Sequence, residues 1–107
     1  ILIYRLVYNL VENAIKYNFS GGTVTVNATQ QNSQLHLTVE DTGNGIPEEL
    51  KERIFEPFFR LDKSRSRELG GVGLGLALVR EIVRVHNGSI LVKNNANSGT
   101  TFEVIFP

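Results

Sequence analysis

The chain of 107 residues contains no cysteine, no tryptophan and no methionine. Without cysteine it can form neither a disulfide framework nor a thiolate metal site. Eleven basic and eleven acidic residues cancel, so no excess of charge points to nucleic acid or to a membrane surface as a partner. No apolar run reaches the length of a membrane span or a signal peptide. These absences leave local motifs as the guide to function.

What is present indicates one globular domain. The length suits a single modest core, and a hydrophobic content of 41% is too high for a disordered chain. The chain opens on Ile1-Leu2-Ile3 inside an apolar pattern and without methionine, which predicts a fragment of a longer protein.

Four glycines fall within six residues, at Gly70, Gly71, Gly73 and Gly75. From Leu76 onward apolar residues recur at helical spacing, which predicts a flexible loop leading directly into a helix. Free N–H groups and the positive dipole end of a helix start favour an anion, so one interpretation is a phosphate cradle. The other is a mobile loop with a glycine hinge. The spacing matches neither a Walker loop nor a Rossmann turn.

Residues 2–17 are predicted to form a helix with one apolar stripe. The stripe consists of Ile3, Leu6, Val7, Leu10, Ala14 and Tyr17. Another face carries Asn9, Asn13 and Lys16. Asparagine is a poor helix former, and Glu, Lys or Gln would suit a merely solvated face better. We therefore favour a polar site on this face over a solvated surface.

The remaining patterns predict four strands and two further helices. Strands are expected at 23–29, 35–40, 89–93 and 101–106, a short helix at 48–54, and a longer helix from 76 to the cap signal at 87–88. The first two strands form a hairpin with one covered face, to which Val24, Val26 and Ala28 contribute. The order of elements predicts an α+β fold, a two-layer sandwich with helices on one face of a mixed, mostly antiparallel sheet.

Two loops combine turn residues with chemistry-bearing ones. Residues 41–47 (DTGNGIP) are a turn, or they present Asp41 at a strand end to the exocyclic amine of adenine. Residues 55–60 (FEPFFR) hold three phenylalanines, which suit a core or a clamp at the base of a loop. The basic stretch after them, residues 60–69, is a solvated charge run or a mobile lid over phosphates.

Four motifs stand in one order and resemble those of the ATP-binding catalytic domain of sensor histidine kinases. Residues 9–17 (NLVENAIKY) resemble the N box, 41–47 the G1 box, 55–60 the F box and 71–78 (GVGLGLAL) the G2 box. The superfamily also includes DNA gyrase, heat-shock chaperone ATPases and mismatch-repair ATPases. The resemblance extends to residues 99–102 (GTTF) and implies a Bergerat-type ATP-binding fold. It also implies that 1–107 is a single domain lacking its first strand and the upstream phosphoacceptor domain.

The resemblance implies a role for the residues at the phosphate end. Asn13 would offer its amide oxygen to Mg²⁺, and Asn9 would hold the phosphate or metal shell. Lys16 would contact phosphate, and Arg60 and Lys63 would contact the γ-phosphate. Asn9, Lys16 and Arg60 are therefore the expected catalytic residues.

At the base end, the resemblance assigns adenine recognition to Asp41, with Gly43 and Gly45 keeping the purine slot open. The other expected nucleotide contacts are Tyr17, Ile46, Phe58, Gly71, Gly73, Leu74, Gly75 and Leu76. Gly71, Gly73, Leu74 and Gly75 would offer backbone N–H groups.

The resemblance also implies a mechanism and partners. Hydrolysing relatives carry a glutamate where this chain has Asn9, and asparagine cannot act as a general base, so ATP hydrolysis by the domain alone should be slow. Neither His36 nor His86 is followed by an acidic residue, so the phosphoacceptor histidine should lie on a separate dimerisation domain of the same protein. A response regulator is the expected downstream partner. The domain itself would be cytoplasmic, in a membrane-anchored protein, and would contact neither nucleic acid nor membrane.

Three other hypotheses fit parts of the sequence. A regulatory module would bind nucleotide without transferring phosphate. An anti-sigma-factor serine kinase is a smaller relative, but the complete F box argues against it. Asp41-Thr42-Gly43 is also the signature of a retroviral-type aspartic protease, which would be all-β and would lack the glycine-to-helix element.

Overall fold

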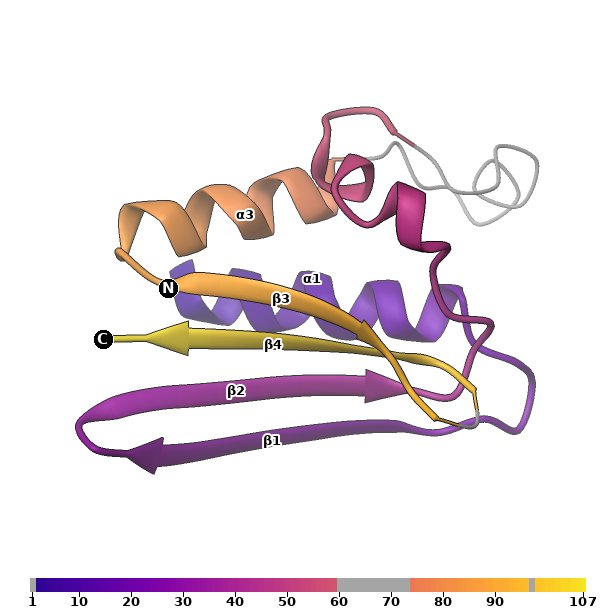
Figure 1. The fold of residues 1–107 in the computed structure, drawn as a ribbon, viewed down its shortest axis with the longest axis horizontal. Coiled ribbons are helices and arrows are strands. Elements are labelled where there is room, and N and C mark those ends of the chain that lie inside the picture. The colour runs from indigo at the N-terminus through magenta and orange to yellow at the C-terminus, as the bar shows by residue number, and fades with distance from the viewer. Residues whose placement is uncertain (1, 60–73, 97) are drawn as a thin grey trace.

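The computed structural model describes residues 2–59, 74–96 and 98–107 (Figure 1). The elements are α1 (Leu2–Lys16), β1 (Val24–Gln31), β2 (Gln34–Asp41), η1 (Glu48–Leu50), η2 (Arg53–Phe55), α3 (Gly75–Val85), β3 (Ser89–Asn94) and β4 (Thr100–Phe106). No helix in these ranges is long and apolar enough to cross a bilayer.

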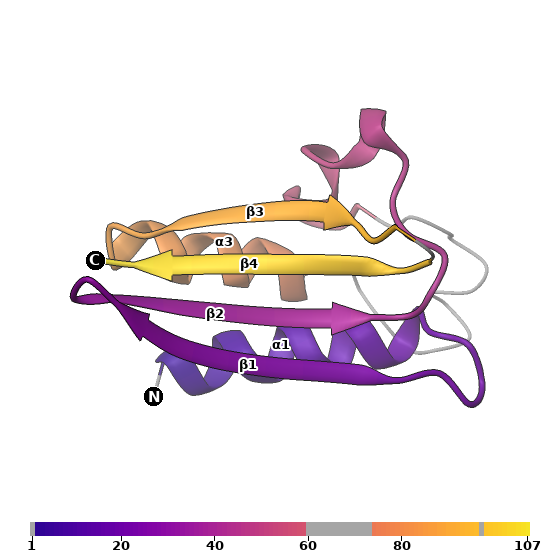
Figure 2. The same cartoon turned by 60° about the horizontal axis from the view of Figure 1, so that its bottom comes forward.

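The four strands form one sheet in the order β1-β2-β4-β3, and α1 and α3 lie side by side on one of its faces (Figures 1 and 2). All three pairings of described strands are antiparallel, with Val39 opposite both Val26 and Phe102. The α+β two-layer prediction is confirmed. The predicted mixed pairing is not seen among the described residues.

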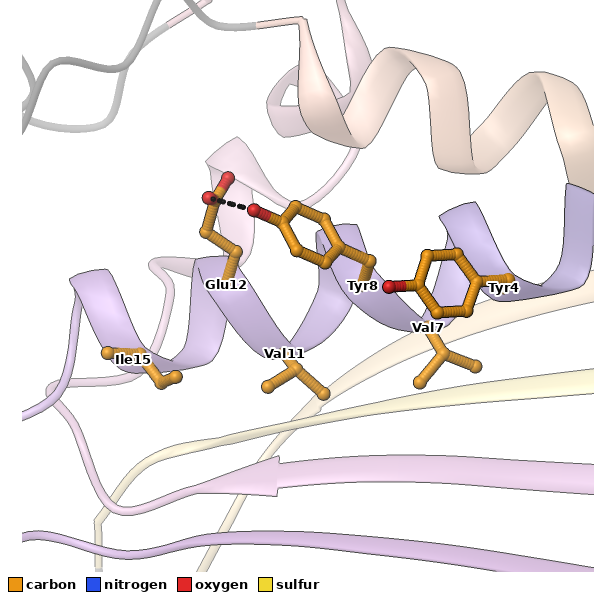
Figure 3. Close-up of a pocket in the computed structure, with 6 residues that line it drawn as sticks. All are labelled: Tyr4, Val7, Tyr8, Val11, Glu12 and Ile15. Atoms are coloured by element: carbon orange, nitrogen blue, oxygen red, sulfur yellow. Dashed lines mark hydrogen bonds between the residues drawn. The ribbon is translucent and has the colours of Figure 1, made fainter. Parts of the chain in front are cut away.

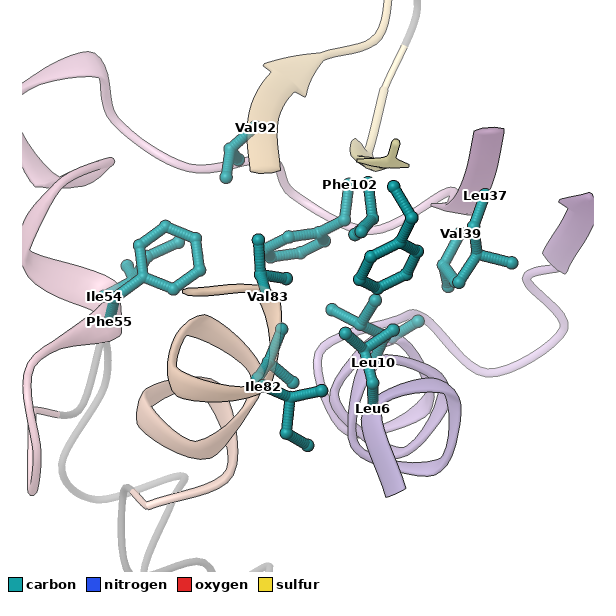
Figure 4. Close-up of a cluster of buried hydrophobic side chains, with 14 of the residues drawn as sticks. Leu6, Leu10, Leu37, Val39, Ile54, Phe55, Ile82, Val83, Val92 and Phe102 are labelled. Carbon is teal, nitrogen blue, oxygen red and sulfur yellow. The ribbon is translucent and has the colours of Figure 1, made fainter. Parts of the chain in front are cut away.

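The core fills the space between the two helices and the sheet (Figure 4). Leu6, Leu10 and Ala14 follow one another at four-residue spacing on α1, and all three are buried. Such spacing places one face of a helix in continuous contact with its neighbours. The inward side chains of α3 are Val79, Ile82 and Val83, and those of β2, β3 and β4 include Leu37, Val39, Val92, Phe102 and Val104. The ring of Phe55 packs edge to face on Phe102, with centroids 6.3 Å apart.

Strand β1 departs from the expected burial. Val26 is 45% exposed and Ala28 is also exposed, although both were predicted to lie on a covered face. The reason is position: β1 is an edge strand, and the buried side chains of α1 pack toward β2 and β4. Alternation alone cannot distinguish an edge strand from a central one.

Two of the helices also differ in extent from the prediction. The segment expected as one helix at 48–54 forms two separate 3-10 turns after Pro47. The long helix α3 begins at Gly75 and ends as predicted with Asn87 in the left-handed region, at φ 57°. His86 Nδ1 lies 2.8 Å from the Ile82 carbonyl oxygen, and its ring packs on Phe106. These contacts give His86 a structural role at the end of α3.

Candidate functional site

Asp41 is a buried carboxylate at the end of β2, only 6% exposed. Its Oδ1 accepts hydrogen bonds from the backbone N–H groups of Gly43, at 2.9 Å, and Thr100, at 3.2 Å. Among the described residues, no donor contacts the second oxygen, Oδ2, and no cationic side chain pairs with the group. One oxygen is therefore anchored to the protein, and the other is available to a donor from a ligand.

The environment of Asp41 favours the neutral carboxyl more than water does. Burial raises its pKa, the hydrogen bonds from Gly43 and Thr100 oppose that change, and the nearby charge of Glu40 adds to it, with a net upward shift. A buried carboxylate without a cationic partner gains from a neutral donor, such as an amino group, that restores part of its lost hydration.

The glycines of the 41–47 loop are required by close neighbours within the protein. A Cβ added at Gly43 would lie 2.3 Å from the carbonyl oxygen of Tyr17. Gly45 has a positive φ of 81°, and its added Cβ would lie 2.9 Å from Oδ1 of Asn94. Any larger residue would push the loop away from the end of α1 or from β3. The role of Gly43 and Gly45 in keeping a purine slot open stays a prediction.

The polar face of α1 meets the start of α3. Asn9, Asn13 and Lys16 are all half-buried on α1. Asn9 donates to the carbonyl oxygen of Arg5 at 2.8 Å, and its Oδ1 would lie 3.0 Å from a Cβ added at Gly75. Asn9 therefore lies against the first turn of α3, where backbone N–H groups have no partner within the helix. Leu74 and Leu76 flank Gly75 at this helix start.

Other predicted contacts divide between the core and the surface. The Ile46 side chain is 7% exposed and belongs to the core. The main chain of Ile46 is hydrogen-bonded to Asn94. Phe55 is buried, as expected for a core residue. Phe59 is half-buried under the Arg53 guanidinium, 4.9 Å from its ring centroid. Phe58 is 69% exposed with a positive φ of 67°, which is unusual for a bulky residue.

Arg60, Lys63, Gly71 and Gly73 lie outside the described residues. The phosphate contacts that the resemblance implies for these four residues therefore stay predictions. Within the described ranges, no group of three or more His, Cys, Asp or Glu side chains is arranged to hold a metal ion. The proposed Asn13 ligand is an amide. Its oxygen suits Mg²⁺, which takes few protein ligands and keeps several waters.

The sequence patterns did not single out as site residues the polar residues that hold the 41–47 loop in place. They are Asn18, Thr42, Asn94, Asn95, Ser98 and Thr100. Asn95, for example, donates to the Asp41 carbonyl oxygen at 3.1 Å. The run of Asn, Ser and Gly between the last two strands signals a turn, but only the pairing of β2 with β4 brings that turn beside Asp41.

An apolar groove of about 380 Å³ lies elsewhere, on the exposed side of α1 (Figure 3). It is lined by Tyr4, Val7, Tyr8, Val11, Glu12 and Ile15. Tyr4 and Tyr8 stack with centroids 6.4 Å apart, and the Tyr8 hydroxyl donates to Glu12 at 3.3 Å. None of the predicted site residues lines this groove, so it is distinct from the candidate site.

The fold defines the structural class of the chain, a two-layer α+β domain in which two helices cover one face of an antiparallel sheet. The family model described as "Histidine kinase-, DNA gyrase B-, and HSP90-like ATPase" matches residues 1–107, and the chain belongs to this family. Its similarity to histidine kinases identifies the chain, within this family, as an ATP-binding catalytic domain of the histidine kinase type.

The chain is 43% identical over 105 residues to the sensor histidine kinase RppB of Synechocystis, covering 98% of this chain. It is 45% identical over 102 residues to the signal transduction histidine-protein kinase ArlS of Staphylococcus aureus, covering 95% of this chain. In both cases the match spans 23% of the relative's length.

Solved structures of histidine kinases have the same fold as this chain. The catalytic domain of histidine kinase ThkA superposes with a TM-score of 0.84 at 34% identity, over 99% of this chain and 66% of that one. The mycobacterial sensor histidine kinase MprB gives 0.83 at 34% identity, over 96% and 68%.

The raised pKa of Asp41 predicts a pH dependence of stability. Folded Asp41 holds its proton to a higher pH than the unfolded chain does, so the contribution of Asp41 to the free energy of unfolding should fall as pH rises above about 4 and level off beyond the raised pKa. Asp41→Asn keeps the acceptor oxygen for Gly43 and Thr100 and removes the charge. The variant should therefore gain stability relative to wild type across that interval.

Urea unfolding of both proteins at a series of pH values measures this difference. Glu52→Gln, which removes an exposed carboxylate without a hydrogen bond or ion pair in the described structure, is the control. A difference between Asp41→Asn and wild type that shrinks as pH rises would contradict the assignment.

Proposed function

We propose that this domain binds MgATP and transfers the γ-phosphoryl group to a histidine on a separate dimerisation domain of the same protein. The observation that carries the proposal is the Asp41 carboxylate, which is buried and which, among the residues that the structure describes, is anchored through Oδ1 alone. Membership of the ATPase family supplies the ligand class. The protein ShkA, 27% identical to this chain with a TM-score of 0.83, has been solved in complex with AMPPNP, which supports the same ligand class.

Asp41 would recognise adenine through its free oxygen. The exocyclic amine of adenine is a donor, whereas guanine presents a carbonyl oxygen at the same ring position. A carboxylate accepts from the first and repels the second, so a buried carboxylate discriminates strongly between the two bases.

The phosphate end would be formed by α1 and the start of α3. Asn13 would give its amide oxygen to Mg²⁺, which supplies positive charge against the phosphates. Lys16 would add a point charge, and Asn9 would hold the phosphate or metal shell. The backbone N–H groups of Leu74 and Gly75 lie at a helix start, where anions are favoured. Arg60, Lys63, Gly71 and Gly73 complete the proposed set.

Transfer would depend on positioning and charge stabilisation more than on acid–base chemistry. Asn9 has no titratable group, so water near the γ-phosphate would lack a general base, whose help is typically worth about 10² to 10⁴ in rate. An acceptor histidine supplies its own nucleophilic nitrogen. The nitrogen–phosphorus bond forms as the bond from the γ-phosphorus to the bridging oxygen breaks, and ADP leaves.

The acceptor lies on another domain in this proposal. His36 is half-buried within strand β2, and His86 packs on Phe106 with Nδ1 at the Ile82 carbonyl. Neither is presented as an open nucleophile. We further propose that the domain is the cytoplasmic part of a membrane-anchored sensor that signals to a response regulator. The names of its relatives, a sensor histidine kinase and a signal transduction histidine-protein kinase, support the signalling role.

Asp41→Ala should weaken ATP binding by roughly tenfold to a hundredfold, the range for losing a hydrogen bond to a charged group, and should abolish the preference for ATP over GTP. Calorimetric titration of both nucleotides measures the two effects. Glu52→Ala is the control, because Glu52 is an exposed carboxylate that is not among the groups that shift the Asp41 pKa. An unchanged ATP-over-GTP ratio in Asp41→Ala would reject adenine recognition by Asp41.

Asn13→Ala should remove the enhancement of ATP binding by Mg²⁺. The wild-type enhancement, measured as the ratio of ATP affinities with Mg²⁺ and with EDTA, should drop by roughly tenfold or more, since even outer-shell partners of a metal contribute that much. Asn27→Ala, at an exposed asparagine on β1, serves as the control. Equal enhancement in Asn13→Ala and wild type would reject Asn13 as the metal ligand.

The kinase assignment itself is tested by phosphoryl transfer. With γ-labelled ATP, the acceptor domain of the same protein should become labelled when this domain is added, and this domain alone should not. An acceptor domain whose histidine is replaced by glutamine is the control. Binding of ATP without any labelling would favour a regulatory nucleotide-binding module, and label on His36 or His86 would overturn the two-domain scheme.

A further inference from the structure

Asn94, the last residue of β3, binds the main chain of Ile46 through both ends of its side-chain amide. Oδ1 accepts the Ile46 N–H at 2.9 Å, and Nδ2 donates to the Ile46 carbonyl oxygen, also at 2.9 Å. The two residues are 48 positions apart in sequence. One side chain thus satisfies both backbone groups of a loop residue, in the manner of a neighbouring strand.

The contact falls at the end of the loop that begins with Asp41. The Ile46 side chain is fixed in the core, and Asn94 fixes its main chain from the other side. The fit is close, because a Cβ at Gly45 would lie 2.9 Å from Asn94 Oδ1. The path of the chain between Asp41 and Ile46 is therefore set at its far end by Asn94.

The start of the same loop is held by different residues. Asn95 donates to the Asp41 carbonyl oxygen at 3.1 Å, and the Ser98 hydroxyl donates to the carbonyl oxygen of Gly43. The Thr100 N–H binds the Asp41 carboxylate directly. The segment between β3 and β4 therefore contacts the loop at Asp41 and at Gly43. Among the described side chains, Asn94 is the one that binds the loop at Ile46.

We propose that Asn94 is a positioning residue for base recognition, which holds the Asp41–Ile46 loop in the shape that binds a purine. This inference rests on the proposed ATP-binding function. Asn94 acts through Ile46 and does not itself contact the base. An amide is required because the interaction uses one donor and one acceptor: an aspartate at this position would lack the donor, and an apolar residue would lack both.

The position predicts a selective effect on nucleotide affinity. Asn94→Ala should weaken ATP binding by roughly threefold to tenfold, the range for losing exposed or half-buried hydrogen bonds, and should reduce the ratio of ATP to GTP affinity. Affinity for inorganic tripolyphosphate should not change, because neither Asn94 nor Ile46 belongs to the proposed phosphate contacts. Asn94→Asp, which keeps the acceptor for the Ile46 N–H, should lose less ATP affinity than Asn94→Ala.

The experiment compares ATP, GTP and tripolyphosphate titrations of wild type, both Asn94 variants and the Asn27→Ala control. Amide exchange of Ile46, followed by NMR without ligand, should be faster in Asn94→Ala. Wild-type affinity for ATP retained in Asn94→Ala, or an equal loss for tripolyphosphate, overturns the inference while leaving the proposed function intact. Failure of the wild-type protein to bind ATP overturns both.

Discussion

The hydrogen bonds that Asp41 receives from the backbone of Gly43 and Thr100 are the constraint on which the site depends. Removing a carboxylate from water is costly unless its oxygens find donors. Both donors here are main-chain groups, one in the loop after β2 and one at the start of β4. Satisfying one oxygen therefore fixes the relative positions of a strand end, a loop and a neighbouring strand. The shape of the site follows from the cost of burying a charge.

The close packing around this carboxylate accounts for the glycines of the region. Gly99 has a φ of 104°, and a Cβ there would lie 1.9 Å from the Asp41 carbonyl oxygen. A Cβ added at Gly43 would likewise lie too close to the Tyr17 carbonyl oxygen, and one added at Gly45 too close to the Asn94 side chain. These glycines are needed to bring three segments of the protein together, whatever ligand occupies the space beside them. A motif that looks like a ligand-binding loop thus has an internal packing requirement as well.

The sequence predicted the elements better than their mutual arrangement. Apolar residues at helical spacing predicted α1 and α3. Leu10 and Val79 belong to these patterns, and both are buried because helical spacing places them on the face that packs against the core. Alternation gave four strands but wrongly buried Val26, because edge position depends on sheet order. Asp41 and the α1 asparagines stood out as polar residues in unusual places. Asn94 did not, because its role depends on a contact across 48 residues that no local pattern encodes.

The candidate site has two ends that the fold builds from different parts. The Asp41 end rests on β2, β4, the turn that contains Asn95 and the residues that follow α1, whereas Asn9 and Gly75 meet where α1 packs on α3. A substitution at Asn9 can therefore alter phosphate chemistry without moving the Asp41 loop. In the proposed scheme, Asn9 stands where hydrolysing relatives carry a glutamate that acts as a general base. This difference suppresses ATP hydrolysis and leaves adenine recognition unchanged. In the proposed scheme, the phosphate chemistry and the choice of base are therefore set by different residues.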